Sequence, residues 1–262
     1  MLLKDKVVIV SGIGPGLGIE LAKLAAAEGA KLAIAARTAS KLDETEQQIA
    51  ALGLDTPVLK VSTDISSAEQ CAELVTQTIA TYGRIDVLIN SAYNPGSFEP
   101  IESANLDSWR QAMDVNLFGT MKLTLDVVAQ MKKQGGGSIV MVNTMVTRKP
   151  LPTQGGYGAS KAALSSATAH LAKELGAYNI RVNSTYMGWM WGAPVQGYIE
   201  AMAAQSGQPA QALIAEIEKN IPLGKIPTDA ECAKAVMFLA SDYASAVTGA
   251  ALDVNGGEYI PH

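Results

Sequence analysis

Tyr157 and Lys161 stand four residues apart at the start of a long apolar pattern of helical period. Because residues four apart lie one turn apart on the same helix face, their side chains are expected to be neighbours. A lysine ammonium beside a phenol stabilises the phenolate and lowers the pKa of the phenol from about 10. Such a tyrosine can donate a proton to a carbonyl oxygen or take one from an alcohol, so the pair predicts acid–base chemistry.

A glycine-rich run lies between a short apolar stretch and a helical pattern near the start of the chain. Glycines allow a sharp turn and a close approach of the backbone to a pyrophosphate, and the following helix N-terminus offers free N–H groups to the phosphates. In this strand–turn–helix context the run predicts a dinucleotide site. Its expected cofactor-binding residues are Gly12, Gly14, Gly16, Leu17 and Gly18.

The second apolar run ends at Arg37, where no acidic residue is present. An acid at this point usually accepts the ribose hydroxyls of NAD, whereas an arginine accommodates the 2′-phosphate of NADP. A guanidinium can pair with that phosphate through two parallel hydrogen bonds. The sequence therefore predicts NADP(H) as cofactor, with NAD(H) still possible. The alternative interpretation of Arg37 is a solvated surface side chain.

Short apolar runs alternate with longer stretches of helical period along the whole chain. The runs are nearly continuous, which is typical of parallel strands buried on both faces. The expected strands are 7–10, 32–36, 58–61, 87–89, 139–142, 180–182 and 251–254. The expected helices are 20–28, 40–51, 67–82, 106–132 and 157–175, in which apolar residues recur three and four apart.

This alternation predicts an α/β fold in which right-handed crossovers build one parallel sheet with helices on both faces. We expect a single doubly wound Rossmann domain over residues 1–262 with about seven strands. Residues 187–222 break the alternation and contain aromatic and methionine side chains without a clear strand. So long a loop in a compact domain is usually functional, so we expect a substrate-binding lid here. The alternative is a simple helical insertion.

Composition excludes several other classes of protein. The formal net charge is −5, so a surface that binds nucleic acid or an anionic membrane is not expected. No apolar stretch is long enough to span a bilayer, and the apolar run at 7–10 is too short for a signal peptide. The two cysteines form no motif, and no residue pattern indicates a metal site. We expect a cytoplasmic protein.

The glycine run, the Tyr157–Lys161 pair and their separation resemble the short-chain dehydrogenase/reductase family from Lys6 to about Gly257. The resemblance implies that Asp64 and Ile65 contact the adenine of the cofactor. It also implies that Asn90 begins a cofactor-binding motif and that Asn116 is a structural and catalytic residue.

Members of the family commonly pair through two long helices, which correspond here to residues 106–132 and 157–175. The resemblance therefore implies a homo-oligomer, either a dimer or a homotetramer. The alternative is that the apolar side chains of these helices only pack within one subunit.

The chain departs from the family pattern at several positions. The usual catalytic serine thirteen residues before the tyrosine is Thr144, whose hydroxyl can still bond a carbonyl oxygen. The asparagine motif ends in Tyr93, which brings a large side chain near the cofactor or pocket. Gly192 stands where the family often has a cofactor-binding threonine. Met190 stands where the family backbone usually contacts the nicotinamide carboxamide.

The resemblance implies reversible hydride transfer between NADP(H) and a ketone, an aldehyde or a secondary alcohol. Tyr157 would transfer the proton, Lys161 would assist it and bind the nicotinamide ribose, and Thr144 would bind the substrate oxygen. Asn116 would hold a water relay behind the lysine. Tyr93, Trp189 and Trp191 indicate a small, apolar or ring-containing substrate.

Three alternatives stay open. The chain could be an NAD-preferring dehydrogenase of the same family, or a cofactor-binding regulator or scaffold that has lost catalytic power, because fold alone does not define function. It could also be an enzyme that reduces a C=C bond. The four-residue spacing of Tyr157 and Lys161 favours the members that act on carbonyl groups.

Overall fold

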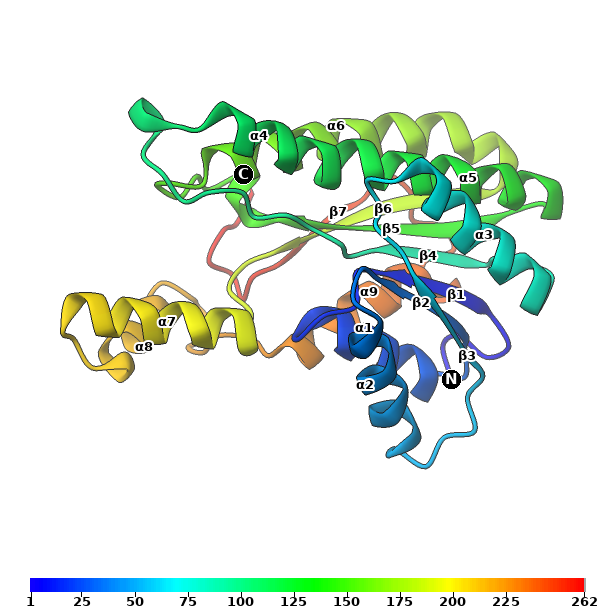
Figure 1. Ribbon diagram of the computed structural model, residues 1–262, viewed down its shortest axis with the longest axis horizontal. Helices are drawn as coiled ribbons and strands as arrows, with labels where there is room; N and C mark the ends of the chain where they lie inside the picture. The colour runs from blue at the N-terminus through cyan, green and yellow to red at the C-terminus, as the bar shows by residue number, and fades with distance from the viewer. Residues whose placement is uncertain (262) are drawn as a thin grey trace.

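The computed structural model describes residues 1–261, and at its centre lies one seven-stranded parallel sheet in the order β3-β2-β1-β4-β5-β6-β7 (Figure 1). The strands are β1 (Val7–Ser11), β2 (Lys31–Ala36), β3 (Val58–Ser62), β4 (Val87–Asn90), β5 (Gly137–Thr144), β6 (Ile180–Met187) and β7 (Ala251–Val254). The reversal of strand order between β1 and β4 is the doubly wound arrangement. The predicted α/β fold is confirmed.

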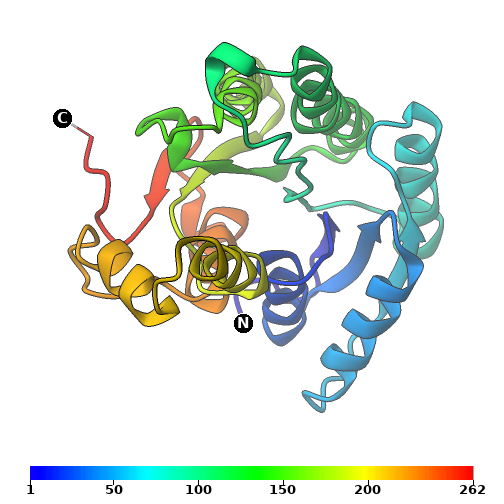
Figure 2. The same cartoon turned by 60° about the vertical axis from the view of Figure 1, so that its left-hand side comes forward.

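Helices cover both faces of the sheet (Figures 1 and 2). The helices on one face are α1 (Leu17–Ala27), α2 (Ala39–Ala50) and α9 (Asp229–Ala240), and those on the other are α3 (Ala68–Tyr82), α5 (Thr120–Gln134) and α6 (Gly155–Leu175). Successive residues of a strand pack into the cores on opposite faces of the sheet. In β1, Val8 and Val10 pack with the first group of helices, and Ile9 packs with the second. Burial on both faces explains why the strands are continuous apolar runs.

The long helix expected at 106–132 is divided. It consists of α4 (Leu106–Met113), a π-helical turn over Asp114–Gly119, and α5. Gly119 lies against the backbone of Ile65, because a Cβ added to it would lie 2.5 Å from the Ile65 carbonyl oxygen. The extra residue of the π-turn also brings Asn116 into the interior, where it is fully buried.

Short 3₁₀ turns complete the helical structure, at Ile101–Ser103, Met145–Thr147, Gly176–Tyr178 and Asp242–Ala244. The segment after β6 contains two helices, α7 (Ala193–Ser206) and α8 (Ala210–Glu218), which extend away from the sheet layers (Figure 1). Ile199 is the only buried side chain of α7, and α8 has none. These helices contribute little to the core.

No helix within residues 1–261 is both long and apolar enough to cross a membrane.

The turn between β1 and α1 is closely packed, and its glycines are required by geometry. Gly12 has φ +102°, and a Cβ on it would lie 2.2 Å from the backbone nitrogen of Ala92. A Cβ on Gly18 would lie 2.2 Å from the carbonyl oxygen of Gly12. The first turn of α1 can therefore approach β1 only when both positions lack a side chain.

We expect Gly18→Ala to lower the free energy of unfolding by about 1–3 kcal/mol, because its new methyl group meets backbone that cannot rotate away. The matched variant is Gly197→Ala in α7, where a Cβ meets nothing within 4 Å. That change should raise the unfolding free energy by about 0.5–1 kcal/mol, because it only removes the backbone freedom of an exposed helical glycine. Urea unfolding followed by circular dichroism measures both. Equal stability of Gly18→Ala and the unchanged protein would contradict the close approach.

Candidate active site

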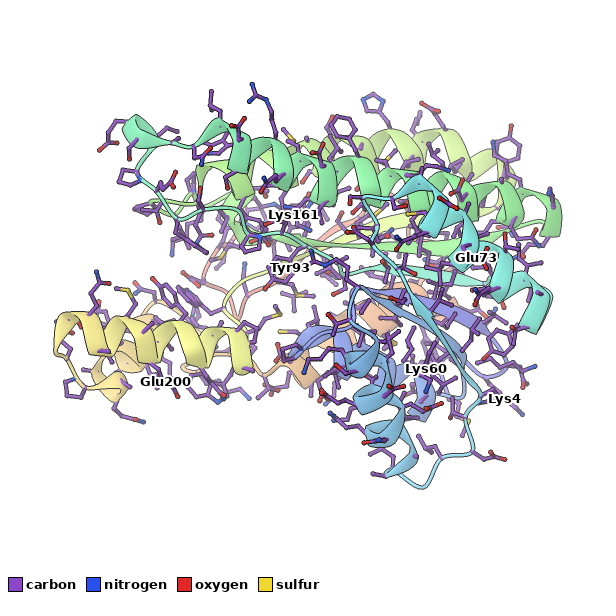
Figure 3. The ribbon with its side chains drawn as sticks, in the orientation of Figure 1. Lys4, Lys60, Glu73, Tyr93, Lys161 and Glu200 are labelled. Carbon is purple, nitrogen blue, oxygen red and sulfur yellow. The ribbon has the colours of Figure 1, made fainter. Side chains whose placement is uncertain are left out.

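A cavity of about 280 Å³ opens at the carboxyl ends of the central strands. The β1–α1 turn, the end of β5, the start of α6 and the segment after β6 surround it. Ligands of open α/β sheets bind in this crevice, where the strand order reverses. Figure 3 shows Tyr93 and Lys161 near the middle of the molecule between the helix layers, whereas Glu200 lies out on α7.

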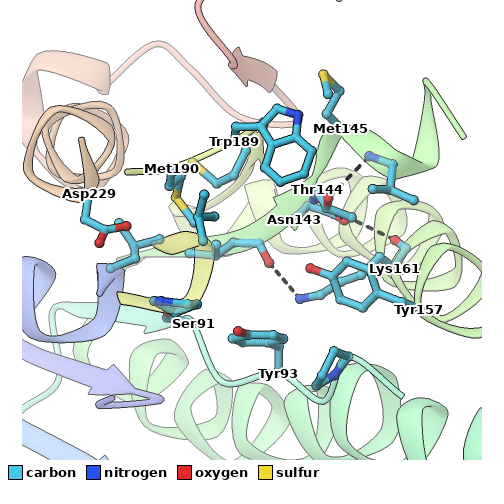
Figure 4. Close-up of a pocket in the computed structure, with 18 of the residues that line it drawn as sticks. Ser91, Tyr93, Asn143, Thr144, Met145, Tyr157, Lys161, Trp189, Met190 and Asp229 are labelled. Carbon is cyan, nitrogen blue, oxygen red and sulfur yellow. Dashed lines mark hydrogen bonds between the residues drawn. The ribbon is translucent and has the colours of Figure 1, made fainter. Parts of the chain in front are cut away.

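Two hydroxyl groups face this cavity from β5 and α6. Thr144 is the last residue of β5, and Tyr157 lies in the first turn of α6 (Figure 4). Asn143 fixes the end of the strand, because its Oδ1 accepts a hydrogen bond from the Thr144 amide at 2.9 Å and its Nδ2 donates to Ser165 Oγ at 2.9 Å. Hydroxyls so placed can bond one substrate oxygen together.

Lys161 lies one helical turn after Tyr157 and is 2% exposed. Its Nζ donates a hydrogen bond to the Val142 carbonyl oxygen at 2.8 Å, and this is the lower dashed line in Figure 4. Burial lowers the pKa of the Lys161 ammonium to about 8, because the charged form loses its hydration. The backbone of β5 thus holds the lysine beside the cavity.

The Tyr157 phenol differs from the sequence-based expectation. Burial raises its pKa above the usual range, and the neighbouring Tyr93 acts in the same direction. The Thr144 hydroxyl beside it acts the other way. Lys161 does not offset these effects, so the lowered pKa of Tyr157 that the sequence predicts is not found. The Tyr157 phenol is therefore neutral at physiological pH.

Asn116 does not face the cavity. Its Oδ1 accepts a hydrogen bond from the Asn94 amide at 2.7 Å, and its Nδ2 donates to the Asn94 carbonyl at 2.8 Å and to Ser160 Oγ at 2.9 Å. Its side chain therefore joins the π-turn, the loop after β4 and the residue next to Lys161. Its catalytic role stays a prediction.

The glycine turn forms an open cradle. Gly14 lines the cavity, and a Cβ on it would meet nothing within 4 Å. Gly16 precedes α1 with φ +104°, and no side chain caps the helix. The amides of the first turn, which no carbonyl of the same helix can reach, are therefore free for an anion. Leu17 and Gly18 line the cavity beside the cradle.

A second cavity, of about 350 Å³, lies on the other side of Gly12 and Gly14. Arg37, Asp64 and Ile65 line it, which brings these three sequence-predicted residues together. Hydrogen bonds from Ser66 lower the pKa of the Asp64 carboxyl, and the exposed Arg37 acts in the same direction. The cradle thus separates two spaces, each large enough for part of an extended ligand.

Asn90 is turned away from both cavities. Its Nδ2 donates to Thr124 Oγ1 at 3.1 Å and to the sulfur of Met141 at 3.2 Å. The side chain therefore ties the end of β4 to α5 and β5. The Asn90 side chain lines neither cavity, so its role in cofactor binding stays a prediction.

The residues predicted to bind substrate are only partly brought together. Tyr93, Trp189 and Met190 line the first cavity, and the Tyr93 ring centroid lies 6.2 Å from that of Tyr157. Tyr93 also lines the second cavity, so it lies at the junction of the two. Trp191 lines neither cavity; its amide donates to the Pro227 carbonyl at 2.7 Å.

Four polar residues of the first cavity are missed by sequence reasoning: Ser91, Asn143, Gln154 and Asp229. Asn143 lies just before Thr144 and extends the strand beyond the apolar run. Gln154 is the residue before α6. Asp229 begins α9, 72 residues after Tyr157 in the chain, and no spacing in the sequence connects it with the site.

Comparison with known proteins shows the family. Residues 12–258 match a family model described as enoyl-(acyl carrier protein) reductase. The 3-oxoacyl-(acyl-carrier-protein) reductase FabG of Thermotoga maritima is 35% identical over 260 residues, which are 99% of this chain and 100% of that protein. Levodione reductase of Leifsonia aquatica is 30% identical over 97% of this chain and 94% of its own. This chain belongs to the short-chain dehydrogenase/reductase family. It is accordingly an oxidoreductase of the class that acts on CH–OH groups.

Solved structures agree along the whole chain. L-Sorbose reductase from Gluconobacter frateurii, complexed with NADPH and L-sorbose, superposes with a TM-score of 0.93 at 26% identity and covers 100% of both chains. NAD⁺-bound xylitol dehydrogenase superposes with a TM-score of 0.91 at 27% identity, over 98% of this chain and 100% of that one. Structures of this fold are therefore known with either nicotinamide cofactor.

The cradle fits the cofactor that the family implies. The uncapped α1 N-terminus and the open space over Gly14 suit a pyrophosphate. The two cavities on either side of this cradle suit the two ends of a dinucleotide.

Burial of Lys161 has a cost in stability that depends on pH. Its folded-state pKa of about 8 lies below the unfolded value of about 10.4, so the unfolded chain binds more protons between these pH values. The destabilisation is therefore complete below pH 8 and disappears as the pH rises through this window.

The relevant quantity is the unfolding free energy of Lys161→Met minus that of the unchanged protein. We expect this difference to be about 2 kcal/mol larger at pH 7 than at pH 9.5. Urea unfolding at the two pH values measures this difference. Lys234→Met, the same change on the exposed side of α9, is the control and should show no such pH effect. If the difference in unfolding free energy is the same at both pH values, Lys161 is not a buried ammonium with a lowered pKa.

Proposed function

We propose that this oxidoreductase transfers a hydride reversibly between NADP(H) and a ketone, an aldehyde or a secondary alcohol. The observation that carries the proposal is the convergence of the Tyr157 and Thr144 hydroxyls beside Lys161, in a cavity continuous with the glycine cradle. These groups can bind one oxygen atom and move one proton to or from it. The cofactor, when bound, supplies or accepts the hydride.

In this mechanism the Thr144 hydroxyl donates a hydrogen bond to the carbonyl oxygen and stabilises its developing negative charge. Tyr157 donates its proton to the same oxygen in reduction and takes it back in oxidation. Burial keeps the phenol protonated, which supports its role as the proton donor. Lys161, with Nζ bound to the Val142 carbonyl, supplies the positive charge that favours the phenolate after transfer.

The substrate class that we propose is small and apolar or ring-containing. Much of the cavity wall is apolar and includes Pro95, Phe98, Met145, Val146, Leu151, Trp189 and Val195. Gln154 is a polar side chain of the same wall that can orient one further group of the substrate. Because Trp189, Pro194 and Val195 come from residues 187–222, we propose this segment as the substrate-binding lid of a single domain.

Reduction of a C=C bond is the second candidate, and the description of the matching family model favours it. The NAD-preferring dehydrogenase and the cofactor-binding regulator are the remaining ones. Screening ketones, alcohols and conjugated enones of increasing size with NADPH and NADH distinguishes all four. Carbonyl reduction with NADPH supports the proposal, and turnover only of the enone double bond overturns it.

Tyr157→Phe removes only the proton-donating hydroxyl, so we expect kcat for carbonyl reduction to fall by about 10²-fold or more while the Kd for cofactor changes little. Tyr243→Phe makes the same chemical change at a side chain that is 76% exposed, and should leave kcat unchanged. Steady-state kinetics and a fluorescence titration with NADPH provide the two readouts. Turnover of Tyr157→Phe within a few-fold of the unchanged enzyme would remove Tyr157 from the mechanism.

Arg37→Ala should weaken NADPH binding by about 10–100-fold and leave NADH binding almost unchanged, because a hydrogen-bonded charge is worth about 1.5–3 kcal/mol. Arg110→Ala is the matched control, an exposed arginine of α4 bound only to Asp107 among the side chains of residues 1–261. Cofactor titrations of the three proteins measure the effect. An equal loss of affinity for NADPH and for NADH would mean that Arg37 does not bind the 2′-phosphate.

Assembly into a dimer or homotetramer stays a prediction. It is supported by large apolar side chains on the outer side of the divided helix, where Phe118 is 63% and Leu125 is 52% exposed.

A further inference from the structure

Asp229 is a carboxylic acid that lines the same cavity as Tyr157 and Lys161. It is the first residue of α9 and is 7% exposed. The N-terminus of its own helix is capped by other groups, because Thr228 and Glu231 form a capping box. No hydrogen bond or ion pair within residues 1–261 includes the carboxylate of Asp229. The carboxyl group reaches the cavity, but a side chain so largely withdrawn from water is costly to ionise without such a partner, so this residue needs a further explanation.

The carboxylate points toward the glycine cradle. A Cβ on Gly192 would lie 1.6 Å from Asp229 Oδ2, and a Cβ on Gly16 would lie 3.1 Å from the same oxygen. Figure 4 shows Asp229 on α9, extending toward the N-terminal segment on the opposite side of the cavity from Tyr157 and Lys161. The space next to Gly192, where the family often has a threonine hydroxyl, therefore contains a carboxyl group in this chain.

Two negative groups would then share one helix N-terminus. The uncapped first turn of α1 is the place for the cofactor pyrophosphate, and Asp229 lies beside Gly16 at its start. An ionised carboxylate at this position repels a phosphate, whereas a neutral carboxylic acid can donate a hydrogen bond to one.

We propose that Asp229 binds the cofactor pyrophosphate as a neutral acid, so that cofactor binding is coupled to the uptake of one proton by this carboxylate. The proton comes from solvent and bonds to a carboxylate oxygen of Asp229; no other bond changes. This inference rests on the proposed cofactor site. Gly192 has no side chain that could donate a hydrogen bond to the cofactor, and the inference assigns this donor role to Asp229.

The charged surroundings of Asp229 are consistent with this coupling. Burial raises the pKa of its carboxyl group to about 6, and the Glu20 carboxylate on α1 acts in the same direction, although Lys23 binds Glu20 at 2.6 Å. Tyr93 faces it from the loop after β4. On its own helix lie the Cys232 thiol and Glu231, and Glu231 is paired with Lys225. A bound pyrophosphate adds negative charge to this set, and so favours the protonated acid further.

The experiment measures the Kd for NADH between pH 5.5 and 8.5 by fluorescence titration. NADH is the main probe because it lacks the 2′-phosphate, which itself titrates near pH 6. For the unchanged protein the Kd should rise above pH 6 with a slope that approaches tenfold per pH unit. Calorimetry in buffers of different ionisation enthalpy should show uptake of about one proton for each NADH bound at pH 7.5.

Asp229→Asn is the decisive variant, because its amide is always neutral and can donate a hydrogen bond. It should bind NADH at least tenfold more tightly than the unchanged protein at pH 8, equally well at pH 5.5, and with no comparable proton uptake. The contribution of Lys161 to the pH profile remains in this variant, so the difference reports Asp229. Asp55→Asn, an exposed aspartate, should behave as the unchanged protein.

A Kd for NADH with the same pH dependence in Asp229→Asn and the unchanged protein overturns the inference and leaves the proposed function intact. Absence of both NADH and NADPH binding at every pH overturns the proposed function, and the inference with it. If Asp229→Asn does not fold, the proton uptake of the unchanged protein decides, because a value near zero at pH 7.5 also overturns the coupling.

Discussion

The parallel pairing of β5 with β6 over eight residues, from Gly137 opposite Ile180 to Thr144 opposite Met187, is the constraint on which the site depends. It carries β5 beyond its other neighbour β4, whose last pair is Asn90 opposite Met141, so that Thr144 reaches the cavity. The Val142 carbonyl, one pleat earlier, holds the Lys161 ammonium. The Asn143 side chain links the strand to α6 through Ser165. Strand register, rather than loop conformation, therefore determines where the reactive hydroxyls meet.

Sequence patterns predict the fold well because the inner strands are buried on both faces, which makes them apolar runs. They end β5 and β6 too early. Asn143 and Thr144 in β5, and Asn183 in β6, are polar, yet their backbone stays in the ladder and their side chains are bonded inside the protein. The π-turn before α5 is also invisible to a helical period; its last residue, Gly119, lies close to Ile65, which is distant in the chain. The local pattern fails where tertiary contacts impose the geometry.

The residues of the candidate site also divide into those that local sequence patterns predict and those that they miss. The glycine turn, Tyr157 and Lys161 are predicted because each lies within one local motif. Asp229 comes from a distant element that only the folded chain brings to the cavity, whereas Gln154 lies three residues before Tyr157 but belongs to no motif. Trp191 is predicted to bind substrate because it is aromatic, but it lines neither cavity. Its backbone instead pairs with the segment before α9. Electrostatics also needs the fold, since burial rather than sequence spacing determines the pKa of Tyr157 and Lys161.

The two outer helices after β6 have a consequence for how this protein can change over evolutionary time. Ile199 is the only side chain that α7 and α8 bury. Substitutions in these helices therefore remove few core contacts, whereas Trp189 before α7 and Pro194 and Val195 in its first turn contribute to the cavity wall. Selection for a different ligand shape can act on this part of the chain almost independently of selection for folding. The same scaffold can thus acquire new specificities without first acquiring extra stability.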